Sequence, residues 1–580
     1  MQLIKAGNLD ADRLTKPLVQ SLVNDYGGAD NDNLNYDFPL YKTLDGALVR
    51  THLLLVSQLC GVVLFGVCDA TQFEDAQTKI TDVDEKIGAA FDCLYARLFR
   101  NSALKESRHS LRFPLRTWLY APRLETLPEG INIESDIFLS VNAVLRELRE
   151  AAHEDLTCET LEEIKATVEG SKGLKTGKGR KDTGEDGNWR GNVIAKLQKD
   201  ICRFDQQQIH GYIQPFQGVE RIRGLAGSGK TVVLAMKAAL THLQDPEARI
   251  VYTFYTKSLY QYIKRLITRF YRQYDERDPD WERLKVMHAW GGYTAQGVYY
   301  EASQAHGVPP LSYTQAVSES DEDNAFDHAC STLLEEAEIT PQYDYLFIDE
   351  GQDFPASFIR LCTYVTQEYS VVWAYDDLQT IFQVRPPEPS DIYGVDSWGN
   401  PKVELANDVV LYKCYRNPRE ILICAHALGF GLYSGQQPVQ MLENKEHWED
   451  IGYRVVEGTL EEGEEVAIKR PRENSLLTVS EACEPEEIVQ ANVYEKYDEE
   501  VKDVADQIQN NLAEGLYAHD ILVIVVDDRH AKNYLNDIGE QLAQKGIKTV
   551  YIHAGPYGVP TFRKDDRVTL STVHKAKGNE

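Results

Sequence analysis

Apolar and polar positions in the first part of the chain follow two different periods. Four stretches rich in apolar residues predict short strands: residues 38–41, 49–57, 61–68 and 111–120. Before the last of them, residues 82–104 place apolar side chains on one stripe at helical spacing, at Val83, Ile87, Ala90, Phe91, Leu94 and Leu98. Together these elements predict a small α/β domain over residues 1–165.

The hydrophobic pattern is interrupted after this domain. Residues 168–192 are rich in Gly and Lys and contain almost no large apolar side chain. This composition predicts a flexible linker, which we place at residues 166–195. Its lysines could contact nucleic-acid phosphates, but the composition favours a solvated tether.

From Asn192 onward, buried strands alternate with helices. Four segments predict strands of one parallel sheet: residues 219–225, 249–254, 343–348 and 371–375. A later unit repeats the alternation, with strands at 520–526, 548–553 and 567–572 and a helix near 529–545. We therefore predict two successive α/β domains: residues 196–390, with an insertion at about 258–340, and residues 391–580, also with an insertion.

Composition excludes several classes of protein. The 580 residues are 43% hydrophobic and 26% charged, which excludes a wholly disordered, collagenous or coiled-coil chain. The sequence has no apolar run of membrane-spanning length and no apolar signal-peptide core at its start, so we expect no membrane association. Ten scattered cysteines form no C-x-x-C pair and predict a reducing, cytoplasmic compartment. The net charge of −30 argues against a surface coated with nucleic acid, but it allows a local basic channel.

A phosphate-binding motif follows the first strand of the predicted sheet. The segment GLAGSGKT matches G-x-x-x-x-G-K-[ST] and opens a helix, a context that disfavours a simple Gly-rich turn. Backbone N–H groups of such a loop surround phosphate oxygens. Lys230 is expected to reach the β- and γ-phosphates of ATP, and Thr231 to ligate Mg²⁺. The expected nucleotide-binding residues here are Gly224, Ala226, Gly227, Ser228, Gly229, Lys230 and Thr231.

Two carboxylates follow a later strand directly. Asp349 is expected to hold Mg²⁺, and Glu350 to orient or deprotonate the attacking water. An Asp-Glu pair after a strand is weak evidence alone. Its combination with a phosphate loop predicts ATP hydrolysis.

A basic segment follows the second strand of the sheet. Residues 257–274 carry five cations and no acid: Lys257, Lys264, Arg265, Arg269 and Arg272. Aromatic residues are interleaved with them, at Tyr260, Tyr262, Phe270, Tyr271 and Tyr274, and Tyr255 precedes them. A cationic face with exposed rings suits a single strand, because charges track phosphates and rings stack on bases. Six apolar or aromatic residues fall at helical spacing and predict that one face of this helix belongs to the core: Leu259, Tyr262, Ile263, Leu266, Ile267 and Phe270. The alternative is an ordinary amphipathic helix whose opposite, basic face is merely solvated.

The order of these motifs resembles that of superfamily 1 helicases of the UvrD/Rep type, from about residue 200 to the last residue. Eight segments carry the resemblance: 204–208 (Q motif), 224–231 (motif I), 253–257 (Ia), 286–290 (Ib), 349–353 (DEGQD, II), 375–382 (III), 415–417 (IV) and 572–580 (V). The resemblance implies tandem RecA-like P-loop NTPase domains that bind ATP and Mg²⁺ in the cleft between them.

The resemblance also assigns roles to individual residues. It implies that Gln208 reads adenine, that Gln379 and Arg416 contact the γ-phosphate, and that Glu580 contributes to the nucleotide site from the second domain. It implies contacts with nucleic acid at Thr253, Phe254, Thr256, Lys257, His288, Phe382, Thr572 and His574. For His288, a packed and hydrogen-bonded role is the equal alternative.

The sequence departs from the family pattern at three points. Tyr375 replaces the glycine of motif III, and Val384 replaces its base-stacking tryptophan. Motif VI, with a second arginine for the γ-phosphate, does not occur before Glu580. We interpret the chain as truncated, with an incomplete second RecA-like domain.

The N-terminal domain is loosely similar to the restriction-endonuclease-type core that is fused to some helicases. Such nucleases need a Glu-x-Lys motif, which the corresponding strand at residues 64–69 lacks. Asp69 and Asp45 are interpreted as turn formers. We predict a non-catalytic domain that positions a protein partner or nucleic acid.

Two functions follow from the sequence. The favoured one is an ATP- and Mg²⁺-dependent 3′–5′ helicase or translocase on single-stranded nucleic acid, with DNA favoured over RNA. The alternative is a nucleotide-gated switch or sensor that binds nucleic acid or a partner with little or no unwinding.

Overall fold

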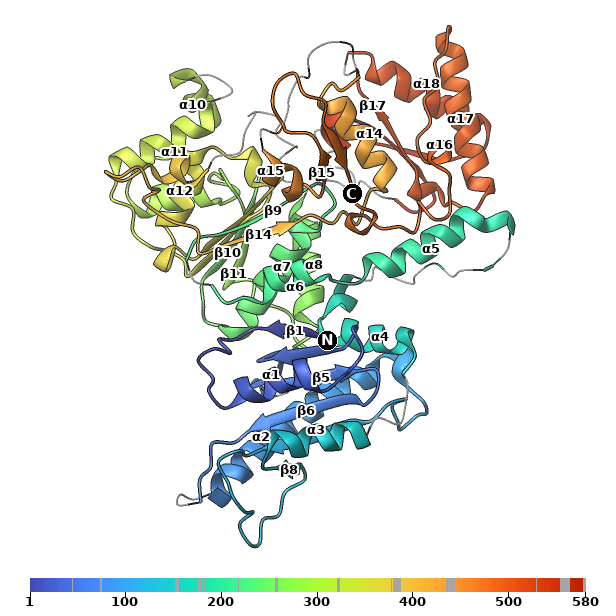
Figure 1. Cartoon of the computed structure of the whole chain (residues 1–580). Helices are drawn as coiled ribbons and strands as arrows, with labels where there is room; N and C mark the ends of the chain where they lie inside the picture. The colour runs from blue at the N-terminus through green and yellow to red at the C-terminus, as the bar shows by residue number, and fades with distance from the viewer. Residues whose placement is uncertain are drawn as a thin grey trace.

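The computed structural model shows a mixed α/β protein with three parts (Figure 1). It describes the chain except for residues 44, 73–75, 152–155, 175–179, 181, 182, 185, 217, 256–258, 321–323, 377, 379–387, 434, 436, 437, 439–441, 443, 528, 553–563 and 577–580, and except for the side chains of residues 186 and 574. Within the described ranges, no helix has both the length and the apolar character needed to cross a membrane.

The N-terminal part is a six-stranded mixed sheet, drawn in blue at the bottom of Figure 1. In spatial order its strands are β1 (Gln2–Lys5), β2 (Asn33–Tyr36), β5 (Leu53–Ser57), β6 (Gly61–Val67), β7 (Leu115–Tyr120) and β8 (Asp136–Phe138). The pairs among β2, β5 and β6 are antiparallel, and the other three pairs are parallel. The two faces are covered by α1 (Thr15–Asp25) with α3 (Val141–Glu150), and by α2 (Ala76–Arg100) with α4 (Cys158–Val168).

The sequence predicted three of the six strands of this sheet and missed β1, β2 and β8. The predicted strand at 49–57 contains β5. The strands at 61–68 and 111–120 and the helix at 82–104 correspond to β6, β7 and α2. The predicted strand at 38–41 is confirmed in part. It contributes to β3 (Leu40–Lys42), which pairs only with β4 (Leu48–Arg50) in a separate two-stranded sheet.

The central part contains six strands, and every pair of neighbours is parallel. In spatial order they are β11 (Leu284–His288), β10 (Ile250–Phe254), β12 (Tyr345–Ile348), β13 (Val371–Tyr375), β9 (Glu220–Gly224) and β14 (Asn407–Leu411). One face packs on α6 (Gln206–Ile213), α7 (Lys230–Gln244) and α8 (Tyr260–Tyr271). The other packs on α9 (Val298–Ala305), α11 (Ala325–Glu336), α12 (Ala356–Tyr364) and α13 (Pro389–Tyr393), with α10 (Tyr313–Glu319) beside α11. The loops that follow the strands therefore meet at one edge of the sheet.

The central sheet extends beyond the predicted domain boundary. The sequence predicted a boundary at residue 390, but β14 pairs with β9 along residues 407–411. The first domain therefore reaches at least Leu411. The short strand β11 was also missed, because LKVMH has too little alternation to stand out.

Parts of the predicted linker at 166–195 that the structure describes pack against the rest of the protein. Gly170 has a φ of +76°, and a Cβ there would lie 2.5 Å from the Tyr274 hydroxyl. Residues Ser171–Leu174 form a 3₁₀ turn against α8, and α5 (Trp189–Ile201) begins within the predicted tether. Gly and Lys composition was therefore misleading here, because the glycines allow close packing.

The third part follows β14 and is drawn in orange and red (Figure 1). It begins with α14 (Arg419–Gly429), α15 (Lys445–Asp450), the antiparallel pair β15 (Arg454–Glu457) and β16 (Ala467–Lys469), and α16 (Pro485–Ile488). A parallel sheet then follows, with β17 (Leu522–Val525), β19 (Val568–Thr572) and β18 (Thr549–Tyr551) in that spatial order. Its helices are α17 (Tyr497–Ala513), α18 (Ala531–Gln544) and α19 (Val573–Ala576). The predicted alternation of residues 520–572 is thus confirmed.

Candidate functional site

The phosphate-loop motif lies between β9 and α7, at the carboxyl edge of the central sheet. Gly227 and Gly229 have φ values of +82° and +92°, a region that favours glycine. Ser228 Oγ is buried and has no hydrogen-bond partner within the described part of the chain. The loop thus has the backbone freedom and an available buried hydroxyl that suit phosphate oxygens.

The Lys230 side chain lies inside the curve of this loop. Its Nζ donates hydrogen bonds to Gly224 O at 2.7 Å and to Leu225 O at 3.0 Å. Nζ also lies 3.4 Å from Asp376 Oδ2. The sequence had not singled out Asp376 as a site residue, although it follows β13 within the motif III resemblance.

Thr231 and Asp349 form a pair of oxygen donors beside the loop. The Thr231 hydroxyl donates to Asp349 Oδ1 at 3.2 Å, and the Tyr252 hydroxyl donates to Asp349 Oδ2 at 2.9 Å. Burial, together with the neighbouring Glu350 carboxylate, raises the pKa of Asp349 to about 7. A cation at this point would stabilise the ionised carboxylate.

The donor set fits Mg²⁺. Mg²⁺ prefers oxygen ligands and often takes only one or two from the protein, with water and phosphate completing the shell. Thr231 and Asp349 match that pattern. Groups of three or more His, Cys, Asp or Glu that could hold a metal alone do not occur in the described ranges.

Glu350 is held in an unusual backbone conformation. Its φ is +54°, in the left-handed region that non-glycine residues rarely adopt. Gln352 donates from Nε2 to the Glu350 carboxylate, while its Oε1 accepts from the Asp376 backbone N–H at 3.1 Å. Gln352 therefore couples the loops after β12 and β13, a role that the sequence did not reveal.

Gln208 contacts the phosphate loop from the start of α6. Its backbone N–H donates to Asp205 Oδ1 at 2.8 Å, and its Oε1 accepts from the Asp205 N–H at 3.1 Å, which forms a capping box. Its Nε2 donates to Ser228 O at 2.9 Å. The predicted adenine-reading side chain thus also supports the loop backbone.

The segment after β14 brings Tyr415 and Arg416 to the same place. The Tyr415 N–H donates to Gly227 O at 2.8 Å, and its hydroxyl donates to Asp205 Oδ2 at 2.5 Å. Arg416 is exposed and lies directly against the loop, because a Cβ on Gly227 would be 2.6 Å from Arg416 Cβ. Arg416, which the resemblance assigns to the γ-phosphate, thus lies beside the phosphate loop, and the contacts of Tyr415 were not predicted.

Several predicted site residues lie outside the described part of the chain. These are Thr256, Lys257, Gln379, Phe382 and Glu580. His574 belongs to α19, but its side chain is not described. Thr572 ends β19 and is half-buried.

Two predicted contacts with nucleic acid need correction. Thr253 and Phe254 belong to the buried strand β10, with 0% and 1% of each residue exposed. Their side chains pack within the protein and are not exposed to a nucleic-acid strand. His288 is half-buried, and its Nε2 lies 2.7 Å from Tyr255 O, so the hydrogen-bonded alternative describes its contact.

The basic helix α8 is only partly available. Lys264 lies 4.5 Å from the ring centroid of Trp281, Arg265 is exposed, and Arg269 is half-buried. Phe270 is buried, as its place on the predicted core face requires, and Tyr271 and Tyr274 are buried as well. Tyr262, which was predicted on the same core face, is 39% exposed. Among the described cations of this segment, Arg265 and Arg272 are exposed, and Arg272 pairs with Asp278, while Lys264 is half-buried. Tyr262 is an exposed ring nearby in the sequence.

Asp45 and Asp69, the two aspartates considered in the N-terminal part, each have an ordinary polar partner. Asp45 is exposed and accepts a hydrogen bond from the Thr43 hydroxyl within a turn. Asp69 lies 3.5 Å from Lys79 Nζ. These contacts agree with a role of Asp45 in the turn.

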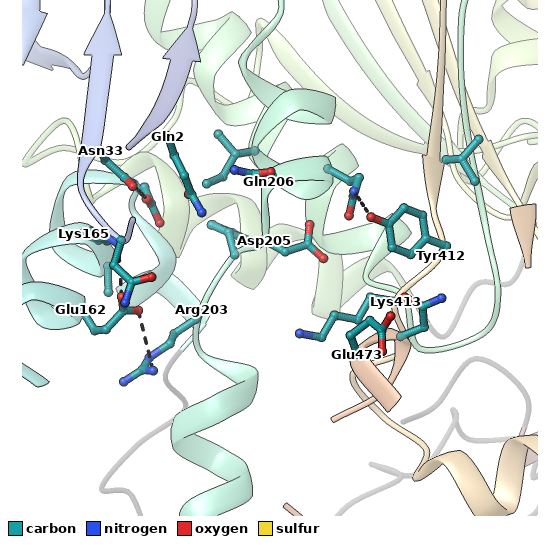
Figure 2. A pocket seen from close by; sticks show the side chains of 18 of the residues that line it. Gln2, Asn33, Glu162, Lys165, Arg203, Asp205, Gln206, Tyr412, Lys413 and Glu473 are labelled. Atoms are coloured by element: carbon teal, nitrogen blue, oxygen red, sulfur yellow. Dashed lines mark hydrogen bonds and ion pairs between the residues drawn. The ribbon is translucent and has the colours of Figure 1, made fainter. Parts of the chain in front are cut away.

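A polar cleft of about 780 Å³ lies where the three parts meet (Figure 2). Gln2 and Asn33 of the N-terminal sheet line one side, Asp205 and Gln206 lie in the middle, and Tyr412 lines the far side. The start of α6 thus contacts the phosphate loop through Gln208 and lines this cleft through its first residues.

No protein-family model matches the chain, and a search of curated proteins finds no sequence match.

Proposed function

We propose that this protein is an ATP-hydrolysing motor with two RecA-like domains that moves 3′ to 5′ on single-stranded nucleic acid and unwinds duplex, with DNA as the favoured substrate. One observation carries the proposal. Lys230, Thr231, Asp349 and Arg416 come from three distant segments of the chain and gather around one Gly-rich loop. A Gly-rich turn without function would require no such convergence.

Each side chain has a definable task in phosphoryl transfer. Lys230 and the backbone N–H groups of the loop would bind the phosphates of ATP. Thr231 and Asp349 would hold Mg²⁺, which neutralises phosphate charge when bound. Glu350 would orient the attacking water and accept its proton, and Arg416 would stabilise the negative charge of the transition state.

The placement of Arg416 also suggests how hydrolysis produces movement. Arg416 belongs to the segment that leads from the central sheet into the third part, whose three parallel strands support a second RecA-like domain. The third part would close when ATP binds and open again after hydrolysis. The distance between the two sheets would therefore alternate between a short and a long value. A strand bound across both parts would then be stepped along.

The surface near β10 and β11 supports a path for a single strand. His288 and Tyr255 lie at the carboxyl ends of these strands, and Tyr255 is 40% exposed. Lys264 and Arg265 follow on α8. Rings and cations in this arrangement suit stacking on bases and contact with phosphates.

The alternative function, a nucleotide-gated switch, is favoured by one specific observation. The N-terminal part and the central sheet share one hydrophobic core, in which Leu54 and Tyr252 belong to the same cluster. A rigidly attached domain can transmit the nucleotide state to a protein partner. We further propose a cytoplasmic location, on the basis of the cysteine pattern.

A displacement assay separates the two functions. The protein is incubated with ATP and Mg²⁺ on a labelled duplex that carries either a 3′ or a 5′ single-stranded overhang. The motor releases the labelled strand from the 3′-overhang substrate in an ATP-dependent manner. Nucleotide-dependent binding without release from either substrate would favour the switch.

A further inference from the structure

Arg470 is a fully buried arginine in the third part, with 0% of the residue exposed. It follows β16 directly. Its guanidinium donates to three backbone carbonyls, Ile451 O at 2.7 Å, Tyr412 O at 3.1 Å and Asn474 O at 2.6 Å. Its Nε donates to Ser475 Oγ at 3.1 Å. All these partners are neutral.

Burial of an arginine without a carboxylate partner costs free energy of folding, so its presence calls for a reason. A buried cation loses its hydration, and a carboxylate is its usual compensation. Arg470 has neutral oxygen atoms as its hydrogen-bond acceptors and a Tyr453 ring 5.3 Å away. The rigid planar fork of arginine allows one side chain to join three separate chain segments, which lysine could not reproduce.

The three joined segments hold one another as well. The Cys414 N–H donates to Asn474 O at 3.0 Å, and the Leu476 N–H donates to Cys414 O at 3.2 Å. Asn474 Nδ2 donates to Gly452 O at 2.9 Å. Gly452 has a φ of +84°, and a Cβ there would lie 2.5 Å from Tyr412 O and 2.8 Å from Arg470 Nη1.

The same segment continues directly to the phosphate loop. Arg470 holds the carbonyl of Tyr412, and the next residues contact the loop through the Cys414 thiol, which donates to Ala226 O at 3.3 Å, and through the Tyr415 N–H. Arg416 follows immediately. The position of its backbone is therefore fixed on one side by the loop and on the other by the Arg470 contacts.

We propose that Arg470 is a positioning residue for Arg416, which holds the 412–416 segment so that the Arg416 guanidinium reaches the transferring phosphate. This inference rests on the proposed function. It assigns no contact between Arg470 and ATP. Its effect is on the geometry of a residue from the third part at a site built on the central sheet.

The test compares Arg470→Lys with Arg416→Ala and with the double variant. Misplacement of a catalytic group by about 1 Å costs about 10²-fold in rate, so we expect kcat of Arg470→Lys to fall by about 10- to 10²-fold. The affinity for ATP should change less than about threefold, because the loop itself is intact. In the Arg416→Ala background, Arg470→Lys should produce no further loss of kcat. Multiplying losses would overturn the proposal.

Two further variants distinguish a positioning effect on kcat from a folding defect. Gly452→Ala keeps the arginine at position 470 but places a methyl group 2.5 Å from Tyr412 O and 2.8 Å from Arg470 Nη1, so it should disturb their contact and reproduce the kcat loss. Arg454→Lys is the matched control, because the Arg454 side chain is 65% exposed in the same region, and it should behave as wild type. A wild-type kcat for a folded Gly452→Ala variant would contradict the proposal.

Hydrogen exchange provides a readout that does not depend on turnover. The Tyr415 amide donates to Gly227 O, so Arg470→Lys should accelerate its exchange in the absence of nucleotide, whereas Arg454→Lys should not. Unchanged exchange at Tyr415 would overturn the positioning role even if ATP is hydrolysed. Absence of ATP hydrolysis in the wild type, with accelerated exchange in Arg470→Lys, would instead refute the proposed function alone.

Discussion

Arg416 lies directly against Gly227, so that a Cβ on this glycine would come within 2.6 Å of Arg416 Cβ. The two residues belong to different segments, one in the phosphate loop and one after the last strand of the central sheet. Their contact means that the loop and the segment leading to the third part cannot move independently. Glycine is required here for space as well as for its positive φ.

Gly227→Ala should therefore impair turnover without unfolding the protein. The positive φ costs alanine about 1–3 kcal/mol, and the methyl group displaces Arg416. We expect ATP turnover to fall at least about tenfold. Gly88→Ala in α2 is the control, because no atom lies within 4 Å of a Cβ there. Steady-state kinetics of both variants would test this, and equal turnover in the two would show that Gly227 does not limit the site.

Glu350→Gln and Lys230→Ala should separate hydrolysis from binding. The amide introduced by Glu350→Gln keeps an oxygen that accepts from the Gln352 side chain but cannot take a proton from water. We therefore expect kcat to fall by about 10²-fold or more with ATP affinity retained. Lys230→Ala removes a charge-assisted contact with phosphate, so affinity itself should fall. Equilibrium binding of a fluorescent ATP analogue, measured beside turnover, distinguishes the two. Near-normal turnover in Glu350→Gln would contradict its role.

The cations of α8 should be visible in the salt dependence of strand binding. Lys264→Ala and Arg265→Ala should each lower the log–log slope of affinity against salt by about 0.7, the value for one phosphate contact on a single strand. Arg283→Ala removes an exposed cation that pairs with Glu247, and serves as the control for net charge. If all three variants show the same slope as wild type, the face of α8 is merely solvated.

Glu169 should make stability depend on pH. Burial raises its pKa from 4.5 to about 8, so between these values the folded state holds a proton that the unfolded state has lost. Its contribution is therefore fully present below pH 4.5 and is lost as pH rises toward 8, with a slope of up to about 1.4 kcal/mol per pH unit.

Thermal unfolding of Glu169→Gln against pH checks this expectation. The variant cannot ionise, and its amide oxygen can still accept from Asn33, which donates to the wild-type carboxylate at 3.0 Å. The loss of stability with rising pH should be smaller in the variant than in wild type. Glu129→Gln alters an exposed carboxylate and should leave the wild-type profile unchanged. Parallel profiles for all three proteins would exclude Glu169 as the source.

Local motifs identified several residues that the structure brings together. The residues of the phosphate loop and Asp349 could be found because each follows a strand directly in the sequence. Tyr252 and Gln352 could not be found in this way, because their contacts depend on which strands are neighbours. Tyr252 reaches Asp349 only because β10 pairs with β12, and the sequence does not state that order.

Composition was the least reliable guide to structure where tertiary packing determines which side chains are buried. Arg180 lies in the predicted tether, but its side chain is 5% exposed, pairs with Asp520 at 2.8 Å and lies 3.6 Å from the Tyr517 ring centroid. Tyr262 was expected on the core face of α8 but is 39% exposed. Alternating basic and aromatic residues indicate that a helix is amphipathic, but not which rings the neighbouring elements cover.

The central claim is that this loop hydrolyses ATP in response to a single strand. Its most direct test is steady-state ATP turnover with Mg²⁺, measured with and without single-stranded DNA, for the wild type and for Glu350→Gln. We predict that the strand stimulates wild-type turnover at least about tenfold, and that the stimulated rate falls by about 10²-fold in the variant. Turnover that is insensitive to the strand, or equal in the two proteins, would contradict the account.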